Sequence, residues 1–438
     1  MNAHQPHEHV TTVHWTRAIL VIFFLMGFGF GTWLSRLPTL RDSLGASTLE
    51  MSMYGLCLAA GSLTGMVFSA RAVERFGPRK MMAFTIVTQV VALPLTVIFM
   101  LAGSIPLGVV ALFVYGLNFS ATDVAMNVSG ANAERVYGLP RLPLMHAFYS
   151  IGAMVSMGVG SATEAMSVAL QPHFIIVGLL IGVLGFFALR WVPRNEDALR
   201  PQASTSSLMA TGPVPVIESA TGDKLATLTG SVPVIAANSG VEADLSGSAA
   251  KRKYTPWRDL RVIFIGLITL SAGLIEGAPA DWLPLALVDG RGVTNQFGAL
   301  ILALFYGAVV TARLAGSAVL MRYTRVAVVR TSLLIAAIGI LFVVLLPGPV
   351  PMIIGTVLWG LGSGVCWPIT ISAAADRHET AARDVAAVSA IGYTSMLLGP
   401  MAFGVLGEQI GLLPSFLVLP IFVIIGVALA GAVREPKQ

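Results

Sequence analysis

Charge and cysteine are both scarce in this sequence. Only 11% of its 438 residues are Asp, Glu, Lys or Arg, whereas 55% are hydrophobic. A soluble globular protein carries about 25% charged residues, so this chain has too few charges to cover a water-facing surface of its size. Its two cysteines, Cys57 and Cys366, are too few for a disulfide framework and fall within apolar stretches. We expect both to be small packing residues.

The residue sets of common catalytic and ligand sites are also missing. The sequence has no nucleophile–base set and no Gly-Lys loop of the Walker type, so we expect neither an enzyme nor an ATP-driven pump, and no cofactor. Four histidines near the start of the chain lack a neighbouring cysteine or acidic cluster, which makes them a poor metal site: His4, His7, His9 and His14. No metal is expected.

The sequence contains long apolar stretches instead. A bilayer core about 30 Å thick is crossed by roughly 20 apolar residues of α-helix. Stretches of this kind lie near residues 18–36, 51–70, 81–102, 105–131, 142–165, 171–192, 260–288, 296–319, 326–347, 351–375, 384–407 and 411–432. They predict an all-α integral membrane protein with twelve transmembrane helices.

One long polar segment divides these stretches six and six. It is rich in Ala, Ser, Thr, Gly and Pro and has too little apolar surface to fold alone. We therefore predict three parts: an N-terminal six-helix bundle with a short cytoplasmic tail over 1–193, a flexible cytoplasmic linker over 194–258, and a C-terminal six-helix bundle over 259–438.

The positions of Lys and Arg predict the orientation, because basic residues favour cytoplasmic loops. Most of the 27 basic residues lie on the side of the N-terminal tail and the polar segment, while Arg36, Arg41 and Arg291 fall on the other side. We expect a multi-pass protein of the bacterial inner membrane with both termini in the cytoplasm. Since the net charge of +5 comes from short loops between apolar stretches, no nucleic-acid partner is expected.

Charged side chains within the apolar stretches are the first candidates for function, because each costs about 2.5–3.5 kcal/mol on insertion scales. Asp123 and Asn127 are one helical turn apart and share a face, and His146 is expected at a similar depth. One interpretation makes Asp123 a proton acceptor with Asn127 and His146 as hydrogen-bonding partners. The other makes Asp123 a tie between helix ends at the inner gate.

The seventh stretch contains two more acids. Glu276 lies near its middle and is our preferred proton- or substrate-binding acid. Asp281 lies nearer the outer surface, where we expect a gate or an interface anchor, and Gly277 and Pro279 between them are expected to break the helix. Arg313, in the eighth stretch, is suited to clamp a carboxylate or phosphate, or else to pair with an acid or helix end of its own bundle.

Polar and aromatic residues from several stretches are candidates to line a central cavity. Trp359 and Trp367 are eight residues apart and so near one face of a helix, in which we expect Pro368 to introduce a kink. Stacked aromatic rings suit sugars, nucleosides or aromatic solutes, and equally suit the lipid interface. The full set of expected cavity residues is Asn118, Tyr306, Trp359, Trp367, Tyr393 and Ser395.

Small residues recur every four positions in the fifth stretch, at Gly152, Ser156 and Gly160. Such a ridge lets another helix backbone approach closely. The stretch lacks the Gly-Pro motif typical of proton-driven drug exporters, which weighs modestly against drug efflux.

The loop between the second and third stretches resembles that of the major facilitator superfamily, through Glu74, Arg75, Gly77, Arg79 and Lys80. The resemblance implies two six-helix bundles around a central cavity, with these residues as a latch for the inward-closed state. Further stretches are similar to a bacterial YbjJ-like subgroup distantly akin to fucose/proton symporters: residues 33–38, 122–127, 146–152, 276–282, 392–393 and 398–400.

Together these features favour a secondary transporter that works by alternating access. The preferred function is proton-coupled uptake of a polar metabolite such as a sugar; the alternative is proton-driven export of a drug or metabolite. A non-transporting receptor or scaffold has little support, because the polar segment contains no foldable domain. The expected partners are a small-molecule solute, protons and the lipid bilayer, and the resemblance implies a monomer.

Overall fold

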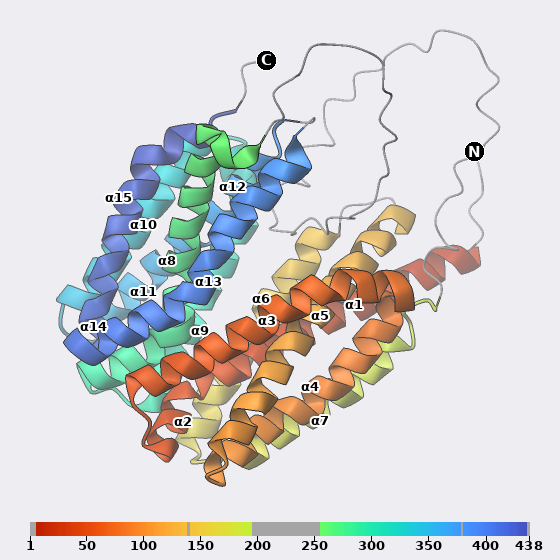
Figure 1. Ribbon diagram of the computed structural model, residues 1–438, viewed down its shortest axis with the longest axis horizontal. Coiled ribbons are helices and arrows are strands. Elements are labelled where there is room, and N and C mark those ends of the chain that lie inside the picture. Colours follow the sequence, from red (N-terminus) through yellow and green to blue (C-terminus); the bar gives the residue numbers. More distant parts are fainter. Residues whose placement is uncertain (1–5, 138–140, 195–254, 378–379, 436–438) are drawn as a thin grey trace.

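The computed structural model describes residues 6–137, 141–194, 255–377 and 380–435, and throughout these ranges the regular structure is helical, without strands (Figure 1). The segment predicted to be a linker lies almost entirely outside these ranges, as does His4. The boundaries of the three predicted parts therefore stay predictions.

Among the described residues, seven helices precede the polar segment. They are α1 (Pro6–Ser35), α2 (Leu37–Leu44), α3 (Thr48–Phe76), α4 (Pro78–Leu101), α5 (Ile105–Tyr137), α6 (Leu142–Ala165) and α7 (Leu170–Leu189). After it come α8 (Leu260–Arg291), α9 (Asn295–Leu320), α10 (Arg325–Leu345), α11 (Pro349–Ser363), α12 (Cys366–Ala374), α13 (Ala381–Ile410), α14 (Leu412–Ser415) and α15 (Leu419–Leu429), with short 3₁₀ turns at Pro256–Arg258, Phe416–Val418 and Ala430–Val433.

Eleven helical segments of the described residues are long and apolar enough to cross a membrane. Helix α6 is not among them, although it has 24 residues and lies along α1 throughout. The twelve predicted stretches all lie in helical structure.

The helices pack in two groups, α1–α7 and α8–α15, drawn in warm and in green-to-blue colours in Figure 1. The groups, called here the N-half and the C-half, meet mainly through α6 against α9 and α3 against α13. Two ends of the molecule are useful landmarks. The basic end contains the α3–α4 and α9–α10 loops with Arg79 and Arg325, and the α2 end is the opposite one, with the short helix α2.

Two features differ from the sequence-based expectation. Helix α8 is not broken at Gly277 and Pro279 but runs continuously from Leu260 to Arg291. Proline has no N–H to donate to the carbonyl four residues earlier, and at Pro279 that carbonyl is on Ile275. The indole N–H of Trp359 donates to this oxygen at 2.8 Å, so the chain satisfies the carbonyl without ending the helix.

The break occurs in the tenth apolar stretch instead. Helix α11 ends at Ser363 and α12 begins at Cys366, with Gly364 and Val365 between them. Gly364 lies four residues before Pro368, which has no N–H to donate to that carbonyl and whose ring clashes with it, so this interruption is the kink expected from Pro368. The expected loop after α1 also contains a helix, the short α2.

The small-residue ridge of α6 packs against α1, as close approach of backbones requires. A Cβ added to Gly152 would overlap the backbone oxygen of Phe24, and one added to Gly27 would overlap that of Tyr149. The α1–α6 contact is thus nearly backbone to backbone, and the two helices form one rigid unit of the N-half.

We predict that Gly152→Ala destabilises the protein, because its new methyl group has to push α1 and α6 apart. Overpacking of this kind costs about 1–3 kcal/mol, visible as a lower unfolding temperature in detergent. The matched control is Gly158→Ala on the same helix, where nothing lies within 4 Å of the new Cβ. Equal unfolding temperatures for the two variants would contradict this account of the contact.

Candidate functional site

An ion pair lies in the middle of the C-half. The Nη2 atom of Arg313 on α9 donates to Oε1 of Glu276 on α8 at 2.7 Å. The Nε atom of Arg313 donates to the carbonyl oxygen of Gly364 at 3.3 Å, which is available because α11 has just ended. Arg313 thus pairs with an acid of its own half, one of the two alternatives that the sequence left open.

Arg313 also reaches the N-half. Its Nη1 atom lies 3.4 Å from the hydroxyl oxygen of Ser150 on α6, which is one turn beyond His146. The His146 ring packs edge-on against Phe23, 5.2 Å between centroids, and its Nε2 atom is buried without a hydrogen-bond partner among the described residues. The guanidinium of Arg313 therefore lies at the boundary between the halves.

Asp123 and Asn127 share a face of α5, as their spacing predicts. The amide nitrogen of Asn127 donates to the backbone oxygen of Asp123 at 2.9 Å and to its carboxylate Oδ1 at 3.2 Å. This fixes the orientation of the amide and leaves Asn127 Oδ1 buried without a partner in the part of the chain that the structure describes. The expected hydrogen bond between Asp123 and His146 is not seen within that part.

Three tyrosines surround these charged groups. Tyr149 of α6 lies close enough to Asp123, Tyr306 and Arg313 for their charges to interact, and Tyr306 of α9 is similarly close to Glu276. Tyr393 of α13 is close enough to Asp123 for their charges to interact, so the expected cavity residues Tyr306 and Tyr393 both lie near the charged residues.

Trp367 and Tyr393 form an aromatic pair on the C-half side of the site. Their ring centroids are 5.7 Å apart, and both side chains are half-buried. A Cβ on Gly273 or on Gly392 would crowd the indole of Trp367, so these two glycines let the ring lie directly on the backbones of α8 and α13.

Trp359 and Asn118, which we also expected to line a cavity, are buried between packed helices. Trp359 is 0% exposed and packs edge-on against Phe305 and Phe416, because its indole is needed at the carbonyl of Ile275. Asn118 is buried and binds Thr88 of α4 at 2.7 Å.

Ser395 and Asp281 are the remaining expected residues. Ser395 is buried, and its hydroxyl donates to the carbonyl of Gly392 in its own helix at 2.6 Å. Asp281 is half-buried on α8 and lies close enough to Tyr306 for their charges to interact. Its role as a gate or an anchor stays a prediction.

The predicted latch residues lie at the turn between α3 and α4. Gly77 has φ +82°, a backbone conformation that favours glycine, and it lets α4 start directly after α3. Glu74 and Arg75 are exposed, and the guanidinium of Arg75 lies over the ring of Phe76, 5.5 Å from its centroid. Arg79 is half-buried and Lys80 is exposed, and the role of these residues as a latch stays a prediction.

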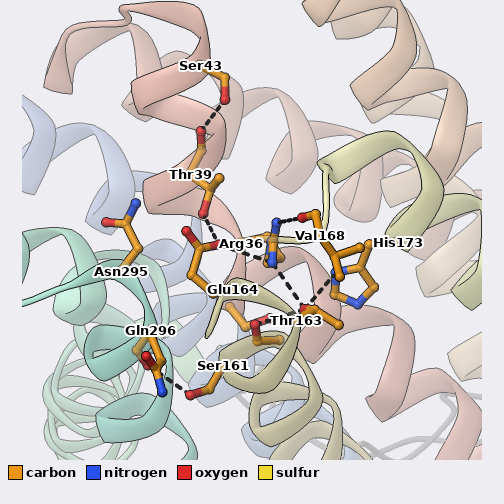
Figure 2. Close-up of polar contacts among 12 residues, drawn as sticks. Arg36, Thr39, Ser43, Ser161, Thr163, Glu164, Val168, His173, Asn295 and Gln296 are labelled. Carbon is orange, nitrogen blue, oxygen red and sulfur yellow. Dashed lines mark hydrogen bonds and ion pairs between the residues drawn. The ribbon is translucent and has the colours of Figure 1, made fainter. Parts of the chain in front are cut away.

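A second cluster, at the α2 end, was missed by the sequence-based analysis (Figure 2). Arg36 is only 2% exposed, and its guanidinium binds Glu164 at 3.1 Å, the hydroxyl of Thr163 at 3.1 Å and the carbonyl of Val168 at 2.7 Å. The Thr39 hydroxyl donates to the same glutamate at 2.7 Å. Arg36 thus ties the end of α1 to the α6–α7 turn. The one signal in the sequence was its place in the stretch 33–38 that resembles the bacterial subgroup.

The two halves are joined at the α2 end by polar contacts. Arg41 of α2 forms an ion pair with Asp289 of α8, and the amide of Asn295 donates to Asp42 at 3.0 Å. Close by, the Ser161 hydroxyl donates to the carbonyl oxygen of Gln296 at 3.0 Å. Together with the backbone N–H of Leu49 on Glu408 at 3.4 Å, these contacts close this end. The described residues contain no group of three His, Cys, Asp or Glu side chains able to hold a metal ion.

We predict that Arg36→Gln destabilises the protein far more than Arg41→Gln does. Removing the buried guanidinium leaves Glu164 and the Val168 carbonyl without this partner, which lowers the free energy of unfolding by about 3–5 kcal/mol. Asp289, the partner of Arg41, is 40% exposed, and loss of such a pair costs at most about 1 kcal/mol. Thermal unfolding of the two purified variants measures the difference, and equal losses would show that the Arg36 cluster is not a structural tie.

Known proteins resemble this chain over nearly its whole length. It is 27% identical to the uncharacterized transporter y4wD of Sinorhizobium fredii, in an alignment that covers 96% of this chain and 98% of the relative. It is 25% identical to an uncharacterized MFS-type transporter of Yersinia pestis (90% and 89% covered), and 24% identical to the membrane protein MosC of Rhizobium meliloti (90% and 84% covered).

Solved structures share the fold. The nucleoside transporter NupG superposes with a TM-score of 0.66 at 14% identity, and the E. coli fucose:proton symporter FucP with a TM-score of 0.54 at 13% identity; each match covers 96% of this chain and 98% of the other.

The model of the Major Facilitator Superfamily matches residues 19–383. The protein is therefore a multi-pass membrane transporter and not an enzyme. This chain belongs to the Major Facilitator Superfamily.

Proposed function

We propose that this protein carries a small polar solute into the cell across the bacterial inner membrane by proton-coupled alternating access. The observation that carries the proposal is the group of Glu276, Arg313 and Asp123 at the middle of the bundle, on the boundary between two halves that are joined at one end. Charged side chains at this depth are retained where they bind or relay something.

The orientation follows from the loops. Because basic residues favour the cytoplasmic side, the basic end faces the cytoplasm, and both termini lie on that side. The α2 end, with its Arg41–Asp289 pair, then closes the outer face. The conformation is inward-facing, which agrees with the open arrangement of the Glu74–Lys80 turn. In the opposite state we expect that turn to latch the basic end.

Proton coupling rests on the balance of charge in a low-dielectric site. Of the two carboxylates, Glu276 is paired with the guanidinium of Arg313, whereas within the described residues Asp123 receives only the Asn127 amide. An ionised carboxylate away from water is costly unless it is paired, so a proton on either acid relieves the excess negative charge. Loading and release of that proton would then change which conformation is favoured.

The side chains around the charged group support a polar, hydroxylated solute. Tyr149, Tyr306 and Asn127 offer hydrogen bonds, and the Trp367–Tyr393 pair offers ring faces against which a sugar or a nucleoside can pack. The solved neighbours are named for a nucleoside and for fucose, both of which are solutes of this kind. We expect a monomer to perform the whole cycle, with the polar segment 194–258 as a cytoplasmic tether of the two halves.

The proposal is tested in two steps. First, the thermal unfolding of the purified protein is measured with sugars, nucleosides, amino acids, organic acids and cationic drugs, since a solute that binds the folded state at 100 times its Kd stabilises it by about 2.7 kcal/mol. Second, uptake of the stabilising solute into proteoliposomes is driven by a pH gradient. We expect accumulation in wild type and its loss in both Glu276→Gln and Asp123→Asn.

Solute exchange without a gradient is the control, because it needs alternating access but no net proton movement. Exchange that persists in the two variants would show that they fold and bind. Full pH-driven accumulation in both would contradict the coupling role of the acids. Net movement of the solute in the direction opposite to the proton flow would favour the exporter instead. Stabilisation by hydrophobic amphiphiles alone would do the same.

A further inference from the structure

An open groove lies at the basic end of the C-half. It has a volume of about 330 Å³ and is lined by Arg261 and Phe264 of α8 and by Gly431, Ala432 and Arg434. Its two sides are the first turns of α8 and the 3₁₀ turn Ala430–Val433, which pack against each other (Figure 1). Because the groove is open to the outside, it can hold one end of a molecule whose remainder lies beyond it.

The charge beside this groove is positive. Asp376 pairs with two guanidiniums at once, those of Arg261 and Arg325, each at 2.8 Å, so it can neutralise only one of them. Arg434 is exposed, and its guanidinium forms no ion pair within the described residues. The neighbouring acid, Glu435, lies 3.7 Å from Arg325 instead. The groove therefore offers a guanidinium that is available to an anion.

Arg261 fixes the shape of the groove. Its Nε atom donates to the carbonyl oxygen of Ala432 at 3.1 Å, and its Nη2 atom donates to that of Arg434 at 3.3 Å. These bonds hold the backbone after α15 against α8. They leave the Nη1 atom of Arg261 without a hydrogen bond to any residue that the structure describes. One arginine is thus held in place by the fold, while the other projects freely.

Two more arginines lie near the groove. Arg258 is exposed in the 3₁₀ turn just before α8. Arg330 of α10 is also exposed, and its Nε atom donates to the carbonyl oxygen of Val427 at 3.3 Å, one helical turn before Gly431. Neither has an acidic partner in the described part of the chain. Together they add to the positive potential that attracts an anion to this surface.

Apolar side chains adjoin these charges. Leu260 and Phe264 are both exposed and lie one turn apart on the same face of α8, and Trp257 is exposed just before that helix. Tryptophan is enriched where a membrane meets water. A free phosphate ion has no use for such neighbours, whereas a phospholipid has an acyl chain to place against them.

We propose that this groove binds the headgroup of an anionic phospholipid of the cytoplasmic leaflet, with Arg434 and Arg261 at the phosphate and Phe264 and Leu260 against the acyl chain. Basic pockets between membrane helices on the cytoplasmic side bind headgroups of this kind. The site is separate from the proposed solute site and takes from the proposed function only the orientation of the basic end. A bound lipid stabilises the junction of α8 with the turn after α15.

The test measures lipid binding to the purified full-length protein in neutral detergent. Phosphatidylglycerol and phosphatidylcholine with identical acyl chains are titrated separately, and native mass spectrometry gives the Kd of the first lipid retained. Each basic residue near an anionic lipid contributes a roughly fivefold gain in affinity. We therefore expect phosphatidylglycerol to bind wild type at least about fivefold more tightly than phosphatidylcholine.

Two variants test the groove by different means. Arg434→Gln removes one charge and should weaken phosphatidylglycerol binding roughly fivefold, with no change in the unfolding temperature without lipid. Gly431→Phe keeps every arginine but fills the groove. Nothing lies within 4 Å of a Cβ added to Gly431, so the ring has room, and the preference for phosphatidylglycerol should disappear. Should Gly431→Phe fail to fold, Arg434→Gln still decides.

Arg322→Gln is the matched control for charge. Arg322 is exposed at the same end of the molecule, in the turn between α9 and α10, and does not line the groove. This variant should bind phosphatidylglycerol as wild type does. Equal losses in Arg322→Gln and Arg434→Gln would show a diffuse attraction and overturn the site, as would equal Kd values of the two lipids for wild type.

Inorganic phosphate is the second probe, because it has the same charged group without the acyl chains. We expect it not to displace phosphatidylglycerol from wild type at matched concentration. Displacement would identify a site for free phosphate and overturn the assignment to a lipid. These measurements involve no solute and no proton gradient, so the proposed function is tested separately.

Discussion

Polar groups inside this bundle have to find their partners within the protein, because hydrocarbon offers none. Two backbone carbonyls show the consequence. Pro279 leaves the carbonyl of Ile275 unpaired, and the indole of Trp359 takes it. The end of α11 frees the carbonyl of Gly364, and Arg313 takes that. The same requirement thus recruits one side chain into the core and holds another at the candidate site.

The long helices could be predicted from the sequence because their signal is length and hydropathy, which need no knowledge of neighbours. The interruption of the tenth stretch agrees with the kink expected from Pro368, but its consequence for the two tryptophans could not be predicted. In one continuous helix Trp359 and Trp367, eight residues apart, would share a face. The interruption at Gly364 and Val365 alters that register, so Trp359 is buried in the C-half core while Trp367 is half-buried beside Tyr393.

The sequence predicted which residues belong to the candidate site better than it predicted which of them contact one another. The cost of a membrane-embedded charge is enough to single out Asp123, Glu276 and Arg313 from one chain, and a four-residue spacing is enough to pair Asp123 with Asn127. That Arg313 binds Glu276, 37 positions away, and also reaches Ser150 depends on how α6, α8 and α9 pack. Such tertiary placement leaves no local pattern in the sequence.

Two arginines in this protein have contrasting surroundings, one within a single half and the other between the halves. Arg36 is 2% exposed and bound to Glu164, Thr163 and Val168 within the N-half, so moving it would strand every partner at once. Arg313 is 36% exposed, and its contacts lie in both halves. A charge whose partners all belong to one rigid group can only stabilise that group. In the proposed alternating-access cycle, a charge with contacts in both halves is one whose contacts would have to change when the halves move.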